Sequence, residues 1–274
     1  MIESLGSTHP SRVRAWLRGL LCIAAALALA GCADTIRDGG FPADNSGSGA
    51  SLSQSESAAT LRLARASRTA GDLASAISLY RQAARTKPVD PALLAELGDT
   101  LLEAKAFDDA IDVYSQIEAT ATVRTSALIG LAKAEIALAE PAKALKNLDL
   151  AQSAEPKDPR VLVNRGVALD LLERHADAQA CYRAVLATTP RHVSARNNLA
   201  LSLALSGQFA EALDIITPMA RSSGAPPRIR QNLAVIYGLM GKREEAAALS
   251  RKDLDPATAD ANLRFFDLVR AGVN

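Results

Sequence analysis

Residues 159–192 read PRVLVNRGVALDLLERHADAQACYRAVLATTPRH, and residues 193–226 read VSARNNLALSLALSGQFAEALDIITPMARSSGAP. Both segments are 34 residues long and carry small residues at equal places, Gly166 with Ala200 and Ala178 with Ala212. The spacing continues in both directions without an insertion. The two series are Ala64, Gly98, Ala132, Gly166, Ala200 and Ala234, and Ala76, Ala110, Ala144, Ala178, Ala212 and Ala246. A fixed period of this size predicts six structural repeats over residues 57–258.

The two series of small residues predict where the two helices of each repeat cross, because only Ala or Gly lets two helix backbones approach closely. Gly71, Gly207 and Gly241 fall between the predicted helices, at a place where a residue with positive φ is least strained as Gly. The main departures are Arg165, where the other repeats have mostly Leu, and Arg243 and Ser250 in the last repeat. The chain is therefore expected to be all-α.

A last helix is predicted after the sixth repeat. Asp255 and Pro256 read as an N-cap followed by Pro at the first helical position. This helix presents four apolar residues on one face, Ala261, Phe265, Leu268 and Val269. A repeat array must end without a bare apolar surface, so residues 259–274 are assigned as a C-terminal capping helix.

The 34-residue pattern resembles the tetratricopeptide repeat (TPR), whose unit is helix A, a turn and helix B. The resemblance implies a right-handed α-superhelix, or α-solenoid, in which the A helices line the concave surface. Such a fold binds protein partners, and the resemblance implies no catalytic role.

The first residues have the pattern of an export signal. Three Arg precede the apolar run 20–30, which is too short to span a bilayer as a mature helix. Residues 29–32, Leu-Ala-Gly-Cys, resemble the bacterial lipobox, which implies cleavage of residues 1–31 and lipidation of Cys32. An ordinary secretory signal or an uncleaved anchor is the alternative. Residues 32–56, rich in Gly and Ser, are expected to form a flexible tether.

Composition and motifs argue against several classes of function. The formal net charge of +1 is too small to create the positive electrostatic field that attracts nucleic acids. His175 and His192 are expected to be solvated, Cys181 to be a packing residue, and no Ser, His and Asp set is expected to converge. We therefore expect no enzyme activity, no metal, no cofactor and no small-molecule substrate.

A candidate docking stripe follows from the A helices of repeats 4 to 6. Repeat positions 2, 6, 9 and 13 share one helical face, and position 6 is Asn164, Asn198 and Asn232. These three amides resemble the asparagine ladder of superhelical TPR domains, which implies contacts to the backbone of an extended peptide. The other candidate residues are Arg160, Arg228, Asn197, Gln231, Val167, Leu201 and Val235. In the alternative interpretation, the amides bond neighbouring helices, and tight superhelical curvature or the terminal helix covers the apolar stripe.

A narrower resemblance rests on the lipobox, the tether and three C-terminal stretches, 230–238, 251–254 and 262–263. Together these are similar to the TadD-type lipoproteins of the tight-adherence (Tad, Flp pilus) system. The resemblance implies an outer-membrane lipoprotein facing the periplasm that assists the outer-membrane secretin and other Tad components. Ala33 rather than Asp after Cys32 agrees with outer-membrane sorting. A TPR adaptor for cell-wall enzymes or another pilus type is the alternative.

Overall fold

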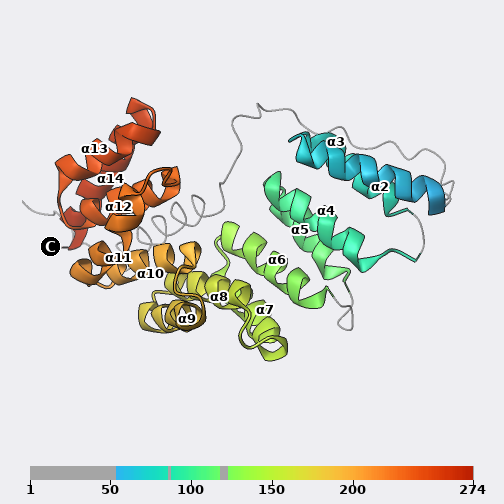
Figure 1. Cartoon of the computed structure of the whole chain (residues 1–274), viewed down its shortest axis with the longest axis horizontal. Coiled ribbons are helices and arrows are strands. Elements are labelled where there is room, and N and C mark those ends of the chain that lie inside the picture. The colour runs from blue at the N-terminus through green and yellow to red at the C-terminus, as the bar shows by residue number, and fades with distance from the viewer. Residues whose placement is uncertain (1–53, 86–87, 118–122, 274) are drawn as a thin grey trace, which may run out of the picture. The chain divides into compact units, whose positions relative to one another are not determined.

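The computed structural model describes residues 54–85, 88–117 and 123–273. Within these ranges the chain forms thirteen α-helices and no strand, which confirms the predicted all-α fold (Figure 1). The helices are α2 (Gln54–Thr69), α3 (Leu73–Ala83), α4 (Pro91–Glu103), α5 (Phe107–Ser115), α6 (Arg124–Ala137), α7 (Pro141–Ala154), α8 (Pro159–Leu171), α9 (His175–Thr188), α10 (Val193–Leu205), α11 (Phe209–Arg221), α12 (Pro227–Leu239), α13 (Arg243–Asp253) and α14 (Pro256–Val273).

The predicted signal segment 1–31, Cys32 and the tether up to residue 53 lie outside the described residues. None of the helices that the structure describes combines the length and the apolar character that a membrane crossing requires.

The helices form two compact units, divided between Pro156 and Lys157. In the unit that ends at Pro156, each A helix packs on its own B helix, and α4 also packs on α6. In the unit that begins at Lys157, α10 packs on α8 and α12 in the same manner, and α14 packs on α12 and α13. Each unit is thus built from neighbour contacts between helix pairs, as expected for a repeat array.

The small residues at the helix crossings are buried as the sequence predicted. Among the second series, Ala76, Ala110, Ala144 and Ala178 are all fully buried. Glycine is used where an aromatic ring fills the crossing: a Cβ on Gly98 would stand 2.6 Å from carbons of the Tyr114 ring. A Cβ on Gly130 would also clash with carbons of this ring, so the Tyr114 ring lies close to the backbones of both α4 and α6. The period of 34 residues therefore has a steric cause.

The turn between helices A and B has a left-handed residue at the same place in every repeat. Gly71, Gly207 and Gly241 have φ of 82°, 81° and 78°, which confirms the prediction for these glycines. Lys105, Ala139 and Glu173 occupy the equivalent places in repeats 2 to 4, with φ of 60°, 60° and 61°. The repeat geometry thus imposes a positive φ even where the sequence does not supply Gly.

The last helix, α14, begins at Pro256 and is capped by Asp255, whose Oδ1 accepts a hydrogen bond from the Thr258 backbone N–H at 3.0 Å. Its buried face consists of Ala259, Leu263 and Phe266. The face predicted from the sequence was wrong: Ala261 is exposed, Leu268 is 55% exposed, and Phe265 is only partly buried. The physical reason is that Phe266, not its neighbour, fills the space above Gly238 of α12.

Ion pairs join α14 to the last repeat. Arg243 contacts Asp267 at 3.4 Å, and Arg251 contacts Asp260 at 3.5 Å. Arg243, which departs from the apolar pattern of the earlier repeats, therefore has a partner on the capping helix. Both pairs are about half exposed, so each adds little stability, on the order of 0 to 1 kcal/mol.

Candidate functional site

The predicted docking stripe lies entirely in the unit that begins at Lys157, on α8, α10 and α12. Asn164 of α8 is partly exposed, and its Nδ2 donates to the Arg160 backbone oxygen of the same helix at 2.7 Å. This contact is local, so it leaves the amide at the surface of α8.

The other amides form a chain across two helices. Asn232 Nδ2 donates to Asn197 Oδ1 at 3.0 Å, and Asn197 Nδ2 donates to Asn198 Oδ1 at 3.2 Å. Asn197 is 1% exposed and Asn232 is 4% exposed. The three asparagines at position 6 therefore differ in exposure. Packing of α12 on α10 buries Asn232, together with Asn197, in the core. Their role in partner binding stays a prediction.

One atom of this chain is unsatisfied. Asn232 Oδ1 is fully buried and finds no hydrogen-bond donor among the described residues. A buried acceptor left in this way costs on the order of 1 to 3 kcal/mol. The bond between Asn232 and Asn197 corresponds to the alternative interpretation, in which amides tie neighbouring helices together.

The two candidate arginines also have contacts within the protein. Arg160 Nη2 lies 2.7 Å from Asp158 Oδ2, and Asp158 Oδ1 caps α8 by accepting from the Arg160 backbone N–H. Arg228 is partly buried and has an interaction of its own, and Gln231 is partly exposed. These side chains lie at the start of α8 and α12, where the sequence placed them, but the arginines are already engaged.

The apolar candidates are Val167, Leu201 and Val235, all partly buried. Val235 packs, together with Leu239, against the cluster of Ala246, Ala247, Leu263 and Phe266. The capping helix α14 contributes two members of that cluster, so it covers part of the stripe on α12. Val235 is therefore partly covered by α14, whereas Asn164, Val167, Asn198 and Leu201 on α8 and α10 are partly exposed.

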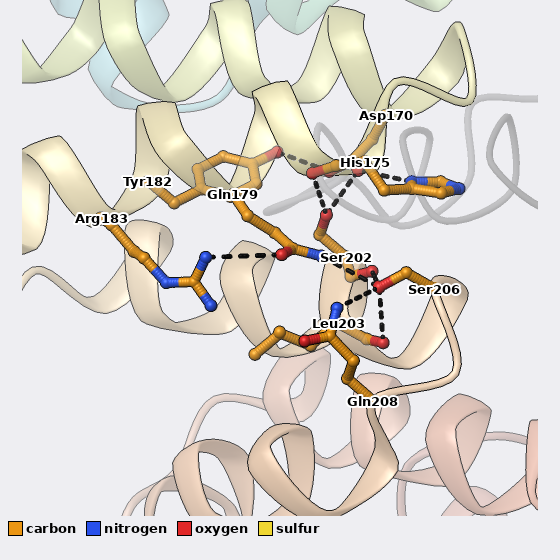
Figure 2. A network of polar contacts seen from close by, with 9 residues as sticks. All are labelled: Asp170, His175, Gln179, Tyr182, Arg183, Ser202, Leu203, Ser206 and Gln208. Carbon is orange, nitrogen blue, oxygen red and sulfur yellow. Dashed lines mark hydrogen bonds and ion pairs between the residues drawn. The ribbon is translucent and has the colours of Figure 1, made fainter.

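A buried polar network between repeats 4 and 5 escaped the sequence analysis (Figure 2). The Asp170 carboxylate accepts from Ser202 Oγ at 2.6 Å and Tyr182 Oη at 2.9 Å, and its Oδ1 lies 2.8 Å from His175 Nδ1. Burial raises the pKa of Asp170, although the three hydrogen bonds act to lower it. Burial beside Asp170 also raises the pKa of Tyr182.

The expectation that no Ser, His and Asp set would converge was wrong, because the turn between α8 and α9 brings His175 to Asp170 while α10 supplies Ser202. The arrangement is nevertheless unsuited to nucleophilic catalysis. Ser202 is fully buried and donates to the carboxylate, whereas a nucleophilic serine must donate to the base and reach a substrate. A comparison of repeat positions could have found the pair, since Asp170 and His175 stand where repeats 2 and 5 have apolar residues.

The network continues beyond Asp170 into the fifth repeat. Gln179 Nε2 donates to Ser206 Oγ at 3.0 Å, and Arg183 Nη2 contacts Glu211 Oε1 at 3.1 Å (Figure 2 shows Arg183 beside Gln179). Side chains of α9 therefore contact the end of α10 and the start of α11, on either side of the turn of repeat 5.

Both histidines have structural partners, which corrects the expectation that they are solvated. His175 bonds Asp170, and His192 caps α10 because its Nδ1 accepts from the Ala195 backbone N–H at 3.2 Å. Cys181 is buried, as expected for a packing residue, and its Sγ accepts from Arg165 Nη1 at 3.3 Å. Arg165, which departs from Leu at its repeat position, thus contacts the B helix of its own repeat. Across the described residues, His, Cys, Asp and Glu form no group of three that could hold a metal ion.

The A helices of repeats 1 and 2 carry charged pairs instead. Arg65 Nη2 contacts Glu96 Oε1 at 2.6 Å, and Arg68 Nη2 contacts Glu103 Oε1 at 2.6 Å. The hydrogen bond from Arg65 holds the pKa of Glu96 below its usual value, and Tyr80 Oη donates to the same carboxylate. These two ion pairs therefore connect α2 to α4.

The C-terminal stretch 230–238 has a structural role of its own. Arg230 Nε donates to Asp253 Oδ2 at 2.8 Å, and its Nη1 donates to the Ala225 backbone oxygen. The Asp253 side chain is only 7% exposed. Arg230 therefore connects α12 to the end of α13 and to the loop before α12.

Comparisons with known proteins agree with this architecture. The family described as tetratricopeptide repeat matches residues 61–122 and 172–217. A tetratricopeptide repeat protein from Parabacteroides merdae has a crystal structure with a TM-score of 0.63 and 22% identity, covering 80% of this chain and 88% of that chain. At this identity the likeness shows the fold alone.

Two curated relatives match parts of the chain. A protein named y4yS from Sinorhizobium fredii is 40% identical over 82 residues, which is 30% of this chain and 45% of that protein. The cellulose synthase 2 operon protein C of Komagataeibacter xylinus is 33% identical over 132 residues, 47% of this chain and 10% of that protein. The chain thus spans less than half the length of these relatives.

The repeat register, the left-handed turn in every repeat and the family match agree with one another. The chain has the fold of a tetratricopeptide repeat solenoid.

Proposed function

We propose that this protein is a docking scaffold that holds a partner protein on the A helices of repeats 4 and 5. The observation that carries the proposal is the TPR fold itself, which presents a row of A helices. The partly exposed side chains Asn164, Val167 and Leu201 provide amide and apolar contacts for an extended peptide.

The scaffold is further proposed to be lipid-anchored in the bacterial envelope. Leu29-Ala30-Gly31-Cys32 supports lipidation of Cys32, and the Gly- and Ser-rich segment that follows supports a tether. A membrane anchor confines the scaffold to one surface and so raises the effective concentration of partners on that surface. The outer membrane, with the repeats facing the periplasm, is the proposed location.

Within that setting, the proposed role is assistance to the outer-membrane secretin and other components of Flp pilus assembly. This part of the proposal rests on the similarity of the lipobox, the tether and the C-terminal stretches to TadD-type lipoproteins. Gene deletion should remove surface pili and reduce the secretin multimer. Normal pili together with normal multimers would refute the Tad role.

The partner itself can be sought by capture. The purified chain should retain secretin or pilus ATPase components from a solubilised envelope, and Asn164→Ala should reduce that capture about fivefold, the effect of losing one hydrogen bond of roughly 1 kcal/mol. Ser78→Ala, an exposed position on α3, is the matched control. Equal capture by both variants would remove Asn164 from the docking site.

A second candidate function is that of an adaptor for another envelope complex, such as cell-wall enzymes or another pilus type. The match to proteins named for cellulose synthase operons extends this candidate to a polysaccharide synthase. The capture experiment distinguishes the two, because murein hydrolases or synthase subunits in place of the secretin would favour the second candidate.

A further inference from the structure

The first A helix, α2, exposes a face that later A helices bury. Position 7 is Leu in most repeats, and Leu97 and Leu199 are 3% and 4% exposed, whereas Leu63 of α2 is 56% exposed. Ala59 and Ala66, at positions 3 and 10 of repeat 1, are exposed as well. The residues at these two positions on α4, α10 and α12 are all buried: Leu93, Thr100, Ala195, Ser202, Ile229 and Ile236. The face of α2 therefore has the pattern of a packing surface but lies at the surface of the described chain.

The last helix, α14, also exposes an apolar face. Its buried residues repeat the spacing of those in α12, which puts Phe266 at position 10. On α12, positions 9 and 12 are Val235 and Gly238, and both lie against α14. On α14, positions 9 and 12 are Phe265, which is partly buried, and Leu268, which is 55% exposed. This face of α14 is therefore the place on which a further A helix would pack.

Consecutive A helices meet at constant repeat positions. Position 12 of one A helix contacts position 10 of the next, since Asp170 Oδ1 accepts a hydrogen bond from Ser202 Oγ at 2.6 Å (Figure 2). A Cβ on Gly238, again at position 12, would stand 2.4 Å from the ring of Phe266 at position 10 of α14. The two contacts differ in chemistry, so it is the geometry of the repeats that decides which positions meet.

This register pairs the two exposed faces with each other. Position 12 of α14 is Leu268, and position 10 of α2 is Ala66. A large side chain would then meet a small residue, as Phe266 meets Gly238 within the chain. Close packing of a large residue against a small one brings two helix backbones together without a void. The two faces are therefore complementary in shape at the position that the register predicts.

The neighbouring position adds a polar contact to the apolar one. Position 9 of one A helix meets position 6 of the next in repeats 1 and 2, where Arg65 Nη2 lies 2.6 Å from Glu96 Oε1. On the two exposed faces these positions are Phe265 and Arg62, and Arg62 is exposed. A guanidinium within about 6 Å of a Phe ring is attracted to the face of the ring. The same register thus places a cation beside an aromatic side chain.

We propose that α14 of one copy of this chain receives α2 of a second copy, so that copies associate head to tail and continue the row of A helices. Such an interface is heterologous, because the two copies contribute different surfaces. The association goes beyond the proposed function, which concerns a partner protein on α8 and α10. An interface of two helix faces is small, and the proposed lipid anchor would compensate by concentrating the copies on one membrane.

Cross-linking between two introduced cysteines tests the association. The full chain carries Ala66→Cys and Leu268→Cys together with Cys22→Ser and Cys32→Ser, so the buried Cys181 is the remaining natural thiol. At increasing protein concentration, a short bis-maleimide should produce a ladder of dimers, trimers and larger species on a denaturing gel. A mixture of the two single-cysteine chains should stop at the dimer, because each of these chains has one reactive end.

The matched control moves the first cysteine to another exposed place in repeat 1. Ser78→Cys on α3, combined with Leu268→Cys, should give no ladder. Absence of the ladder from the Ala66 and Leu268 chain would overturn the association, as expected if residues 32–53 or another protein cover α2. A cross-link confined to the monomer, or a dimer from Ala66→Cys alone, would overturn it as well, because the first joins the two faces within one copy and the second joins α2 to α2.

Discussion

The turn of each repeat is where single residues of this chain are most strained. Lys105, Ala139 and Glu173 adopt φ near +60°, at the place where the other repeats have Gly. A left-handed conformation costs a residue with a Cβ roughly 1 to 2 kcal/mol. Repeats 2 to 4 therefore keep a geometry that their own sequences do not favour, and the packing of the two helices maintains it.

Replacing Ala139 by Gly should stabilise the unit that ends at Pro156 by about 1 kcal/mol, because Gly removes the steric cost at φ of 60°. The measurement is the urea midpoint of unfolding at unchanged slope. The reverse change at the equivalent place, Gly207→Ala, should destabilise by a similar amount. A loss of stability on Ala139→Gly, as for Gly in a helix interior, would contradict this account.

The amides at position 6 show that one residue type can have different roles in successive repeats. Asn164 bonds only its own helix, whereas Asn232 bonds Asn197 across two helices and leaves its Oδ1 unsatisfied. The sequence could place these residues on the A helices but could not show which would be drawn into the core. That outcome depends on how closely α12 approaches α10.

Asn232→Ala should therefore destabilise the fold by about 1 to 3 kcal/mol, because Asn197 loses a hydrogen bond in a buried site. Asn164→Ala should change stability by about 0.5 kcal/mol or less, since its amide is partly exposed and bonds only the backbone of α8. Chemical unfolding of both variants checks the contrast. Equal losses would mean that the two amides are structurally equivalent.

At the scale of helices, α14 takes the place that an A helix of a seventh repeat would have. It packs on α12 and α13, and its buried residues Ala259, Leu263 and Phe266 follow the same spacing as Ile229, Leu233 and Ile236 of α12. Asp260, Arg264 and Asp267 are exposed on it. The array thus ends on a helix with one apolar and one charged side.

Phe266→Ala should undock this helix, since Phe266 is 6% exposed and its ring fills the crossing above Gly238. Removal of a buried Phe side chain costs about 3 to 5 kcal/mol. Faster hydrogen exchange and proteolysis of residues 256–273 would report the release. Leu268→Ala is the control, because Leu268 is 55% exposed and should leave both measurements unchanged. Release by Leu268→Ala alone would restore the face that the sequence predicted.

Periodicity predicted the elements of the fold but not their side-chain partners. The helix crossings could be located because Ala and Gly recur at a constant interval, and a steric requirement of this kind is visible in one sequence. The choice between Phe265 and Phe266 could not be made, since both continue an apolar face and only the position of Gly238 decides. The Asp170 network was equally hidden, because its members come from three helices.

For the whole molecule, the A helices of the two units carry different kinds of surface residues. The unit that ends at Pro156 uses charged residues to tie α2 to α4, through Arg65 with Glu96 and Arg68 with Glu103. The unit that begins at Lys157 holds every residue of the candidate docking stripe. In the proposed function, partner binding belongs to the second unit, and attachment to the envelope belongs to the residues before α2.

The proposed attachment of the chain to the membrane through a lipid on Cys32 can be tested by one substitution. Each buried CH2 of an acyl chain contributes about 0.8 kcal/mol to membrane binding, and several chains make attachment effectively permanent. Cys32→Ser should therefore abolish labelling by a fatty acid and move the protein from the membrane fraction to the soluble fraction. Circular dichroism should show the same helical content, because residue 32 precedes every helix described here. Cys181→Ser changes a buried thiol of α9 instead and should leave the lipid label in place. A Cys32→Ser protein that stays in the membrane fraction, or a natural chain without the label, would show that the repeats reach the envelope by another route.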